Sequence, residues 1–282
     1  MNRLRAAVRL VGAVPITFFF YSVSVGASLL LGAWPRTRAR VHGWSFRSWS
    51  RSLCRLFGVR VRVEGAAPKA PFVLVSNHVS YLDILALGTE LRCVFVAKAE
   101  IDGWPLFGAM CRSVRTIFID RKVKRKLPAV LEQIEATLAA GQGIVIFAEG
   151  TSGAGHVVLP FRSSLLELPA RLGRPVHWAA LGYRVIGDAA PVHLAVTWWA
   201  DMPLGAHLWS LLQLRGVEAR LVLGREPVAH TDRKRLSDAL HRAVSSAFEP
   251  MVDAAEVDRL LALREQNPSA VPPILRPTSG SS

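Results

Sequence analysis

The sequence has few cysteines and few acidic residues. Its three cysteines, Cys54, Cys93 and Cys111, are far apart and include no C-x-x-C pair. This excludes a disulfide framework and a zinc site and favours free thiols in a reducing compartment. The 282 residues carry 35 Lys and Arg against 21 Asp and Glu, a formal charge of +14, and 51% of them are hydrophobic. Such a chain is not disordered, and its charge suits nucleic acid or an anionic membrane surface.

The N-terminal segment predicts attachment to a membrane. Residues 10–35 carry no charge and lie between Arg9 and Arg36. As one helix they would be about 39 Å long, against a bilayer core of ~30 Å. The run is also longer than the ~7–15-residue apolar core of a cleavable signal peptide, which is the alternative. Arginines flank both ends, and Pro15 and Gly26 can break the helix. We therefore expect a re-entrant pair of short helices with both ends on the cytoplasmic face, rather than a single span.

A basic helix is expected next. From Arg36 to Arg62 there are eight arginines and no acidic residue. Their spacing places three arginines on one ridge of the helix and leaves an apolar side opposite them: Arg47, Arg51 and Arg55 against Trp44, Trp49, Leu53 and Phe57. This pattern predicts a helix that lies on an anionic membrane surface. The alternative is an amphipathic helix that packs against its own domain.

Beyond Phe57 the apolar pattern becomes that of short strands alternating with helices. The expected strands are 59–63, 72–76, 93–97, 116–119, 144–147, 176–181 and 192–198, and the helices between them are 82–90, 125–140, 163–172 and 204–214. This alternation predicts an α/β domain over residues 58–250, with a layered, largely parallel sheet flanked by helices. Residues 1–57 form the membrane-anchoring helices. Residues 251–282 form a C-terminal extension that ends in a loose tail from Gln266.

A His-Asp pair follows the second expected strand, in the segment Ser76-Asn77-His78-Val79-Ser80-Tyr81-Leu82-Asp83. Reactive groups of α/β sheets lie where a strand ends and a helix begins. Asp83 can hold one imidazole nitrogen of His78 and leave the other as a base toward a substrate hydroxyl. The sequence has no G-x-S-x-G and no cysteine with a neighbouring histidine, so direct attack by a bound hydroxyl is favoured over a covalent intermediate. The alternative is that Ser80 and Asp83 form a capping box.

Two further strand ends carry polar residues. In Phe147-Ala148-Glu149-Gly150-Thr151-Ser152, Gly150 permits an unusual turn, although a plain strand exit has the same pattern. Phe118-Ile119-Asp120-Arg121 leads into a cluster of cations that ends at Lys126. This cluster either holds a phosphate or is a solvated helix start.

These three segments, in this order, resemble the glycerolipid acyltransferase family typified by lysophosphatidic acid acyltransferase. Asn77, His78 and Asp83 match its Asn-His-x4-Asp block, 118–121 matches its Phe-Ile-Asp-Arg strand, and 147–152 matches its Phe-Pro-Glu-Gly-Thr-Arg block in four positions. The resemblance covers roughly residues 60–200. It implies transfer of an acyl group from acyl-CoA or acyl-carrier protein to the free hydroxyl of a lyso-lipid in lipid biosynthesis, such as lysophosphatidic acid, with no metal or cofactor. It also implies a catalytic domain on the cytoplasmic face of a bacterial-type inner membrane.

The resemblance implies a role for each matching residue. His78 is the general base and Asp83 orients it. The residues of the acceptor site are Arg121, Glu149, Gly150, Thr151 and Arg162, and those that support the motifs are Asn77 and Phe118.

Departures from the family pattern leave the acceptor open. Ala148 stands where many members have proline, Ser152 where they have arginine, and Trp178 in place of a second proline of the fourth block. Loss of the arginine weakens the case for a phosphate monoester. Ser152-Gly153 and the segment 158–165 resemble the subgroup that acylates lyso-ornithine lipids, so both acceptors remain candidates.

A function of another class also remains, namely a non-enzymatic basic module that binds membrane surfaces. Such a module would need the basic helix but not the His-Asp pair. A nucleic-acid partner is not expected, because the sequence has no zinc finger and no aromatic-interleaved binding motif.

Overall fold

The computed structural model describes residues 2–103, 108, 111–112, 115–119, 127–171 and 173–276. Its strands are β1 (Val59–Glu64), β2 (Val73–Ser76), β3 (Cys93–Lys98), β4 (Ile117–Ile119), β5 (Gly143–Phe147), β6 (Val176–Ile186) and β7 (Gly216–Leu223). Its longer helices are α1 (Asn2–Leu30), α2 (Pro35–Phe57), α3 (Leu82–Glu90), α5 (Leu127–Ala139), α8 (Leu204–Gln213), α9 (Arg233–Ala247) and α10 (Ala254–Gln266). The short ones are α6 (Glu167–Arg171), α7 (Val192–Ala195), η1 (Ala99–Gly103), η3 (Ser163–Leu166) and η4 (Pro273–Leu275).

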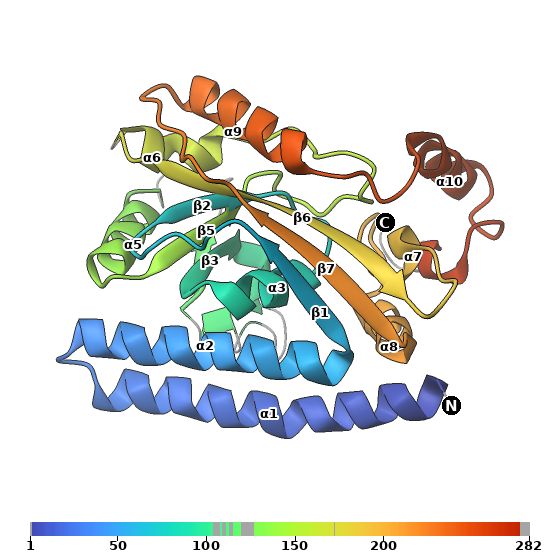
Figure 1. Cartoon of the computed structure of the whole chain (residues 1–282), viewed down its shortest axis with the longest axis horizontal. Coiled ribbons are helices and arrows are strands. Elements are labelled where there is room, and N and C mark those ends of the chain that lie inside the picture. Colours follow the sequence, from blue (N-terminus) through green and yellow to red (C-terminus); the bar gives the residue numbers. More distant parts are fainter. Residues whose placement is uncertain are drawn as a thin grey trace.

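The strands form one mixed sheet in the order β1-β7-β6-β2-β5-β3-β4. All neighbours are parallel except β6 and β7. β2 and β5 lie in the middle and are buried along their whole length, which is typical of parallel strands covered on both faces. The structure confirms the expected α/β fold with a largely parallel sheet flanked by helices (Figure 1).

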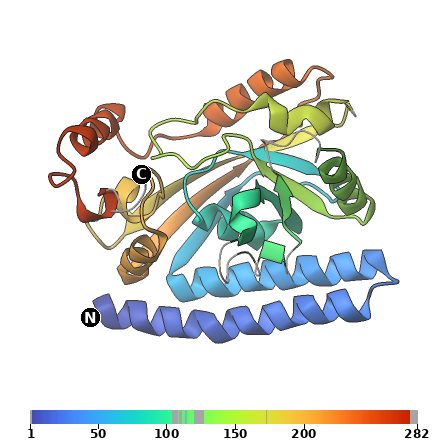
Figure 2. The same ribbon diagram turned by 180° about the vertical axis from the view of Figure 1, so that it is seen from behind.

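Successive residues of β2 point into two different cores. Leu74 belongs to a cluster with residues of α2, α3 and α8, whereas Val73 and Val75 belong to a cluster with residues of α5 and α9. This alternation is the period of two expected of a strand. Figures 1 and 2 show the two layers, with α1 and α2 on one side of the sheet and α9 on the other.

Two segments of the α/β domain differ from the prediction. Residues 192–198, expected as a strand, instead form α7 and a loop in which Trp198 N donates to Val79 O at 2.8 Å. The position beside β6 in the sheet is occupied by β7, which the sequence pattern did not predict. β7 alternates buried and half-buried positions, and Glu218 and Arg220 on its outer face make it less apolar than the other strands.

As far as Arg276, the C-terminal extension packs against the domain and is not the loose tail that was expected. Val271 and Leu275 are each 1% exposed and pack in a cluster with Trp199, Met202 and residues of α10. Their apolar side chains cover the loop between α7 and α8, and burying them offsets the entropy of ordering the tail.

The N-terminal segment is one continuous helix followed by α2, not two short helices broken at Pro15 or Gly26. The chain turns instead at residues 31–34, and α1 and α2 lie side by side (Figures 1 and 2). Ala13 and Ile16 pack against the core on both sides of Pro15, and Trp49 Nε1 donates to Thr17 Oγ1 at 3.1 Å. These contacts with the core and with α2 hold the helix together across the proline.

The basic helix packs against its own domain. Phe46, Leu53 and Phe57 of α2 are buried. Arg47 and Arg51 each donate from Nε to Thr89 O at 2.9 Å, at the C-terminal end of α3. Two of the three ridge arginines thus cap α3, where cations are favourable. The structure therefore matches the alternative interpretation of this helix.

Candidate active site

β2 and α3 bring His78 and Asp83 together. β2 ends at Ser76 and α3 begins at Leu82, so the short loop between them carries His78 and the first helical turn carries Asp83. His78 Nδ1 lies 2.7 Å from Asp83 Oδ2, and the two side chains are 20% and 0% exposed. The second ring nitrogen, Nε2, makes no hydrogen bond within the described part of the chain, where the hydrogen bond of this ring is the one from Nδ1. This leaves Nε2 free to act as a base.

The Asp83 carboxylate is held by four donors. Oδ2 accepts from Val79 N at 2.7 Å and Ser80 N at 3.0 Å as well as from His78. Oδ1 accepts from the Tyr183 hydroxyl of β6 at 2.7 Å. These bonds offset the cost of burying the carboxylate. The bond from Ser80 N is also the helix-capping contact expected as the alternative, so one carboxylate fulfils both interpretations.

An aromatic ring packs against one face of the His78 imidazole and fixes its orientation. Phe147, at the end of β5, stacks on it with ring centroids 4.1 Å apart and an interplanar angle of 15°. Phe95 of β3 stacks on Phe147 in turn, at 5.7 Å. Phe147 pairs in register with Ser76 of β2, so the sheet itself places the ring. His78 is therefore held at one edge by Asp83 and on one face by Phe147.

Glu149 lies beneath the same loop. Its Oε1 accepts from His78 N at 2.9 Å, and Gly153 N donates to His78 O at 2.9 Å. The side chain is 3% exposed, and burial raises the pKa of this carboxyl to about 8 despite the hydrogen bond from His78. Its Oε2 has no partner among the described residues. In this geometry Glu149 supports the His78 loop, and the sequence did not indicate that contact.

Three other expected residues of the acceptor site lie at the turn after β5. Gly150 has φ +75°, which a glycine adopts without strain, and Thr151 is exposed. Arg162 Nε donates to Glu149 O at 3.2 Å, which brings its guanidinium to the same turn. Arg121 lies outside the described residues.

The residues expected to support the motifs lie apart from one another. Asn77 is fully buried, and its side chain donates to Leu181 O at 2.9 Å and accepts from Leu181 N at 2.7 Å, which ties the loop to β6. Phe118 lies on the edge strand β4, three places from β2 in the sheet. The structure therefore does not place Phe118 against His78.

Sequence reasoning missed the contribution of residues far along the chain. Tyr183 comes 100 residues after Asp83, and Ser80 Oγ donates to Val196 O at 2.7 Å. The tyrosine two residues beyond the predicted strand 176–181 was the available signal, because a buried hydroxyl needs a partner.

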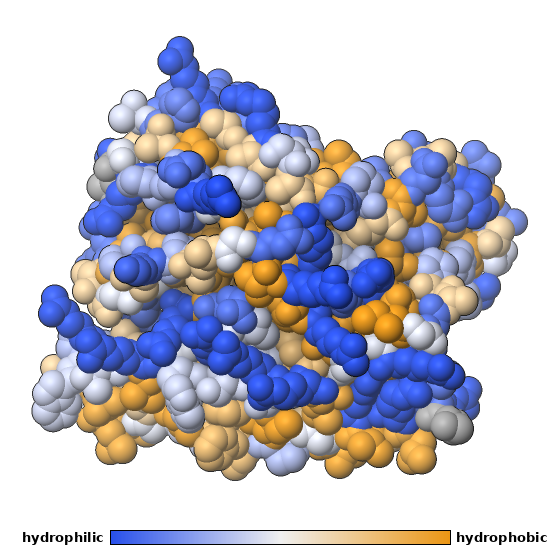
Figure 3. Space-filling view, in the orientation of Figure 1, coloured by the Kyte–Doolittle hydropathy of each residue, from blue (hydrophilic) through white to orange (hydrophobic). Residues whose placement is uncertain are grey.

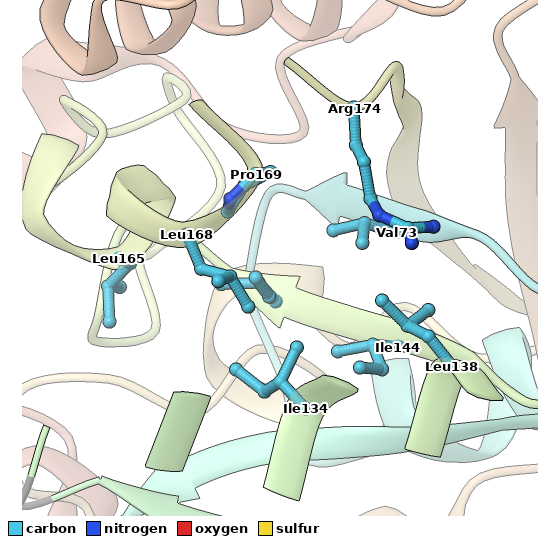
Figure 4. A pocket seen from close by; sticks show the side chains of 9 residues that line it. Val73, Ile134, Leu138, Ile144, Leu165, Leu168, Pro169 and Arg174 are labelled. Atoms are coloured by element: carbon cyan, nitrogen blue, oxygen red, sulfur yellow. The ribbon is translucent and has the colours of Figure 1, made fainter. Parts of the chain in front are cut away.

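Two cavities of the described part lie away from this site. A small apolar cavity of about 10 Å³ lies between α5, α6 and the sheet; Figure 4 shows its lining, with Ile134 and Leu168 among it. A wider groove of about 640 Å³ lies near Pro71, Gly141 and Arg174, at the amino ends of β2, β5 and β6, whereas His78 follows the carboxyl end of β2. Among the described residues no group of three His, Cys, Asp or Glu side chains could hold a metal ion.

Comparisons with known proteins agree on one family. The family model described as Acyltransferase matches residues 58–181. The chain is 33% identical over 233 residues to a lyso-ornithine lipid O-acyltransferase of Brucella abortus, covering 77% of this chain and 87% of that protein. It is 28% identical over 209 residues to a 1-acyl-sn-glycerol-3-phosphate acyltransferase of Neisseria meningitidis serogroup B, covering 73% of this chain and 81% of that protein.

A solved structure has the same fold. The crystal structure of the 1-acyl-sn-glycerophosphate acyltransferase PlsC from Thermotoga maritima matches with a TM-score of 0.51 and 19% identity. The match covers 85% of this chain and 97% of that one.

Proposed function

The chain belongs to the acyltransferase family, and on this premise we propose that it moves a fatty acyl group from acyl-CoA or acyl-carrier protein to the free hydroxyl of a lyso-lipid in membrane lipid biosynthesis. The observation that carries the proposal is the 2.7 Å contact between His78 Nδ1 and the buried Asp83 carboxylate, with Nε2 of His78 left open. This is the arrangement of a general base with its orienting carboxylate.

The geometry supports direct transfer. Nε2 of His78 takes the proton of the acceptor hydroxyl as its oxygen attacks the thioester carbonyl carbon. The tetrahedral intermediate collapses with cleavage of the carbon–sulfur bond, and the leaving thiolate takes the proton back from the imidazolium. Asp83 accepts from Nδ1–H throughout and stabilises the imidazolium while it exists. Glu149 and Phe147 keep the His78 backbone and ring in place.

We propose lyso-ornithine lipid as the native acceptor, with lysophosphatidic acid as the alternative. Ser152 stands where the family pattern has arginine, so this turn carries one cation fewer for a dianionic phosphate. Arg162 uses its Nε on Glu149 O and has its other nitrogens for a ligand. A single carboxylate, as in an ornithine headgroup, needs less positive charge than a phosphate monoester. The relative in Brucella abortus supports this choice by its name.

The acceptor choice predicts the effect of Ser152→Arg. The new guanidinium should improve kcat/KM for lysophosphatidic acid by about one to two powers of ten, because a charge-assisted contact is worth roughly 1.5–3 kcal/mol. It should not improve kcat/KM for lyso-ornithine lipid. The measurement is the ratio of the two activities in wild type and variant. Ser246→Arg, which adds the same charge at an exposed position of α9, is the control and should leave the ratio unchanged.

An unchanged ratio in Ser152→Arg, together with strong wild-type activity on lysophosphatidic acid, would contradict the choice of acceptor. It would leave the acyltransferase activity itself in place.

We propose that the outer face of α1 lies in the membrane. Hydrophobic side chains gather along it (Figure 3), and the most exposed are Leu4, Val8, Val11, Val14, Phe18, Leu29 and Leu30, each at least 60% exposed. Arg9 donates from Nη1 to Leu214 O at 2.7 Å and Arg5 to Gln213 O at 2.8 Å, so α1 is fastened to the end of α8. A helix held along the domain in this way suits embedding in one leaflet, with the catalytic domain on the cytoplasmic face of a bacterial inner membrane.

This proposal predicts that Val14→Asn with Phe18→Asn weakens binding to anionic vesicles at least tenfold, because two apolar side chains leave the membrane. The melting temperature should hardly change, since both side chains are exposed, at 65% and 69%. Cosedimentation with vesicles measures the bound fraction. Val157→Asn with Leu261→Asn, two exposed hydrophobic side chains outside α1, is the matched control. Equal cosedimentation of both double variants would place the membrane contact elsewhere.

A further inference from the structure

Tyr183 contacts the oxygen of Asp83 that His78 does not use. Its hydroxyl donates to Oδ1 at 2.7 Å, whereas His78, Val79 and Ser80 all donate to Oδ2. Within the described part of the chain Tyr183 is the sole donor to Oδ1. Both side chains are buried, with Tyr183 5% and Asp83 0% exposed, so no solvent shares this contact.

The loop that carries His78 also sets the position of Tyr183. The Asn77 side chain makes two hydrogen bonds with the backbone of Leu181, which continue the pairing of β2 with β6 beyond Ser76. Leu181 and Tyr183 lie two residues apart on β6 and pack in the same core cluster, as alternation along a strand requires. The hydrogen bonds to Leu181 therefore also fix the position of the Tyr183 ring, along β6, relative to Asp83.

The chemistry of the contact allows one direction of donation. Burial, and then the nearby Asp83 charge, raise the pKa of Tyr183 well above its ordinary value. The hydroxyl thus stays protonated at every pH at which the protein is assayed. It donates to Asp83 and does not compete with His78 for a proton.

We propose that Tyr183 is a positioning residue of the His78–Asp83 pair, one that fixes the rotation of the carboxylate and draws part of its negative charge toward Oδ1. The inference rests on the proposed function, because it acts through the base of that reaction. It gives Tyr183 a role in setting how tightly the imidazolium is held, beyond packing in the core.

The test is Tyr183→Phe, which removes the hydroxyl and keeps the ring. Without this donor the charge of Asp83 is concentrated on Oδ2, so the imidazolium is held more tightly. The acid limb of the kcat/KM profile should then move to higher pH by roughly half a unit or more. Because the rotation of the carboxylate is no longer fixed, kcat at neutral pH should also fall about tenfold, with the KM for the lyso-lipid unchanged. Loss of one buried hydrogen bond should also lower the melting temperature.

Tyr81→Phe is the matched control. Tyr81 lies two residues before Asp83 but does not contact its carboxylate. Its hydroxyl forms a hydrogen bond with His207 Nδ1 at 3.0 Å. It should lower the melting temperature and leave the acid limb in place. An unmoved acid limb in Tyr183→Phe, or an equal movement in Tyr81→Phe, would overturn the inference. The proposed function fails separately, if the wild type transfers no acyl group to either lyso-lipid.

Discussion

Replacing His78 with alanine is expected to lower kcat by about 10²–10⁴, the usual contribution of a general base. The open Nε2 is the group that takes the proton of the acceptor. No other described side chain donates to Oδ2 of Asp83, so none can replace His78 as the base that this carboxylate orients. Release of thiol from the acyl donor measures the rate. The variant should still fold, since the His78 side chain is 20% exposed and the loop remains tied to Glu149 through its backbone.

The matched control for this variant is His241→Ala. His241 is also half-buried, has one ring hydrogen bond, from Nε2 to Val158 O, and contacts one aromatic ring, that of Phe161. It lies on α9, so its loss costs similar packing without touching the site, and it should keep wild-type turnover. A folded His78→Ala protein with more than a tenth of wild-type activity would remove His78 from the mechanism.

Replacing Asp83 with asparagine should lower kcat by a similar amount, about 10²–10⁴. The amide oxygen can still accept from Val79 N and Ser80 N, and the amide nitrogen can donate to the Tyr183 hydroxyl. The fold should therefore keep its stability, while the charge that stabilises the imidazolium is gone. Turnover and melting temperature of the same preparation separate the two roles of Asp83. A lower melting temperature with turnover spared would show that the residue only caps α3.

The sequence was informative where chemistry and local pattern coincide. The apolar run before Ser76 predicted β2, and the polar turn after it placed His78 and Asp83 within one hydrogen bond of each other, because five residues of loop and first helical turn restrict where the carboxylate can lie. Glu149, Gly150 and Thr151 were likewise expected at a strand end and lie there.

What the sequence could not predict depends on distant contacts. The arginine ridge of α2 has the pattern of a helix on a membrane surface, but Thr89 and Glu90 lie at the end of α3 to receive Arg47 and Arg51. The apolar run 192–198 has strand propensity, yet β7 takes the place beside β6 and leaves that run to pack over Val79. The contact of Tyr183 with Asp83 joins residues 100 positions apart, and no local pattern encodes it.

A competition assay tests the proposed reaction most directly. The purified protein with all 282 residues is given lyso-ornithine lipid and lysophosphatidic acid on anionic vesicles, together with a labelled acyl thioester, and the lipid product is identified by mass. We expect the wild type to add one labelled acyl group to the free hydroxyl of lyso-ornithine lipid in preference to lysophosphatidic acid. We expect folded His78→Ala to form neither product at a comparable rate. A protein that consumes no thioester and acylates neither lipid, or a His78→Ala variant that acylates both at the wild-type rate, would contradict the proposed function.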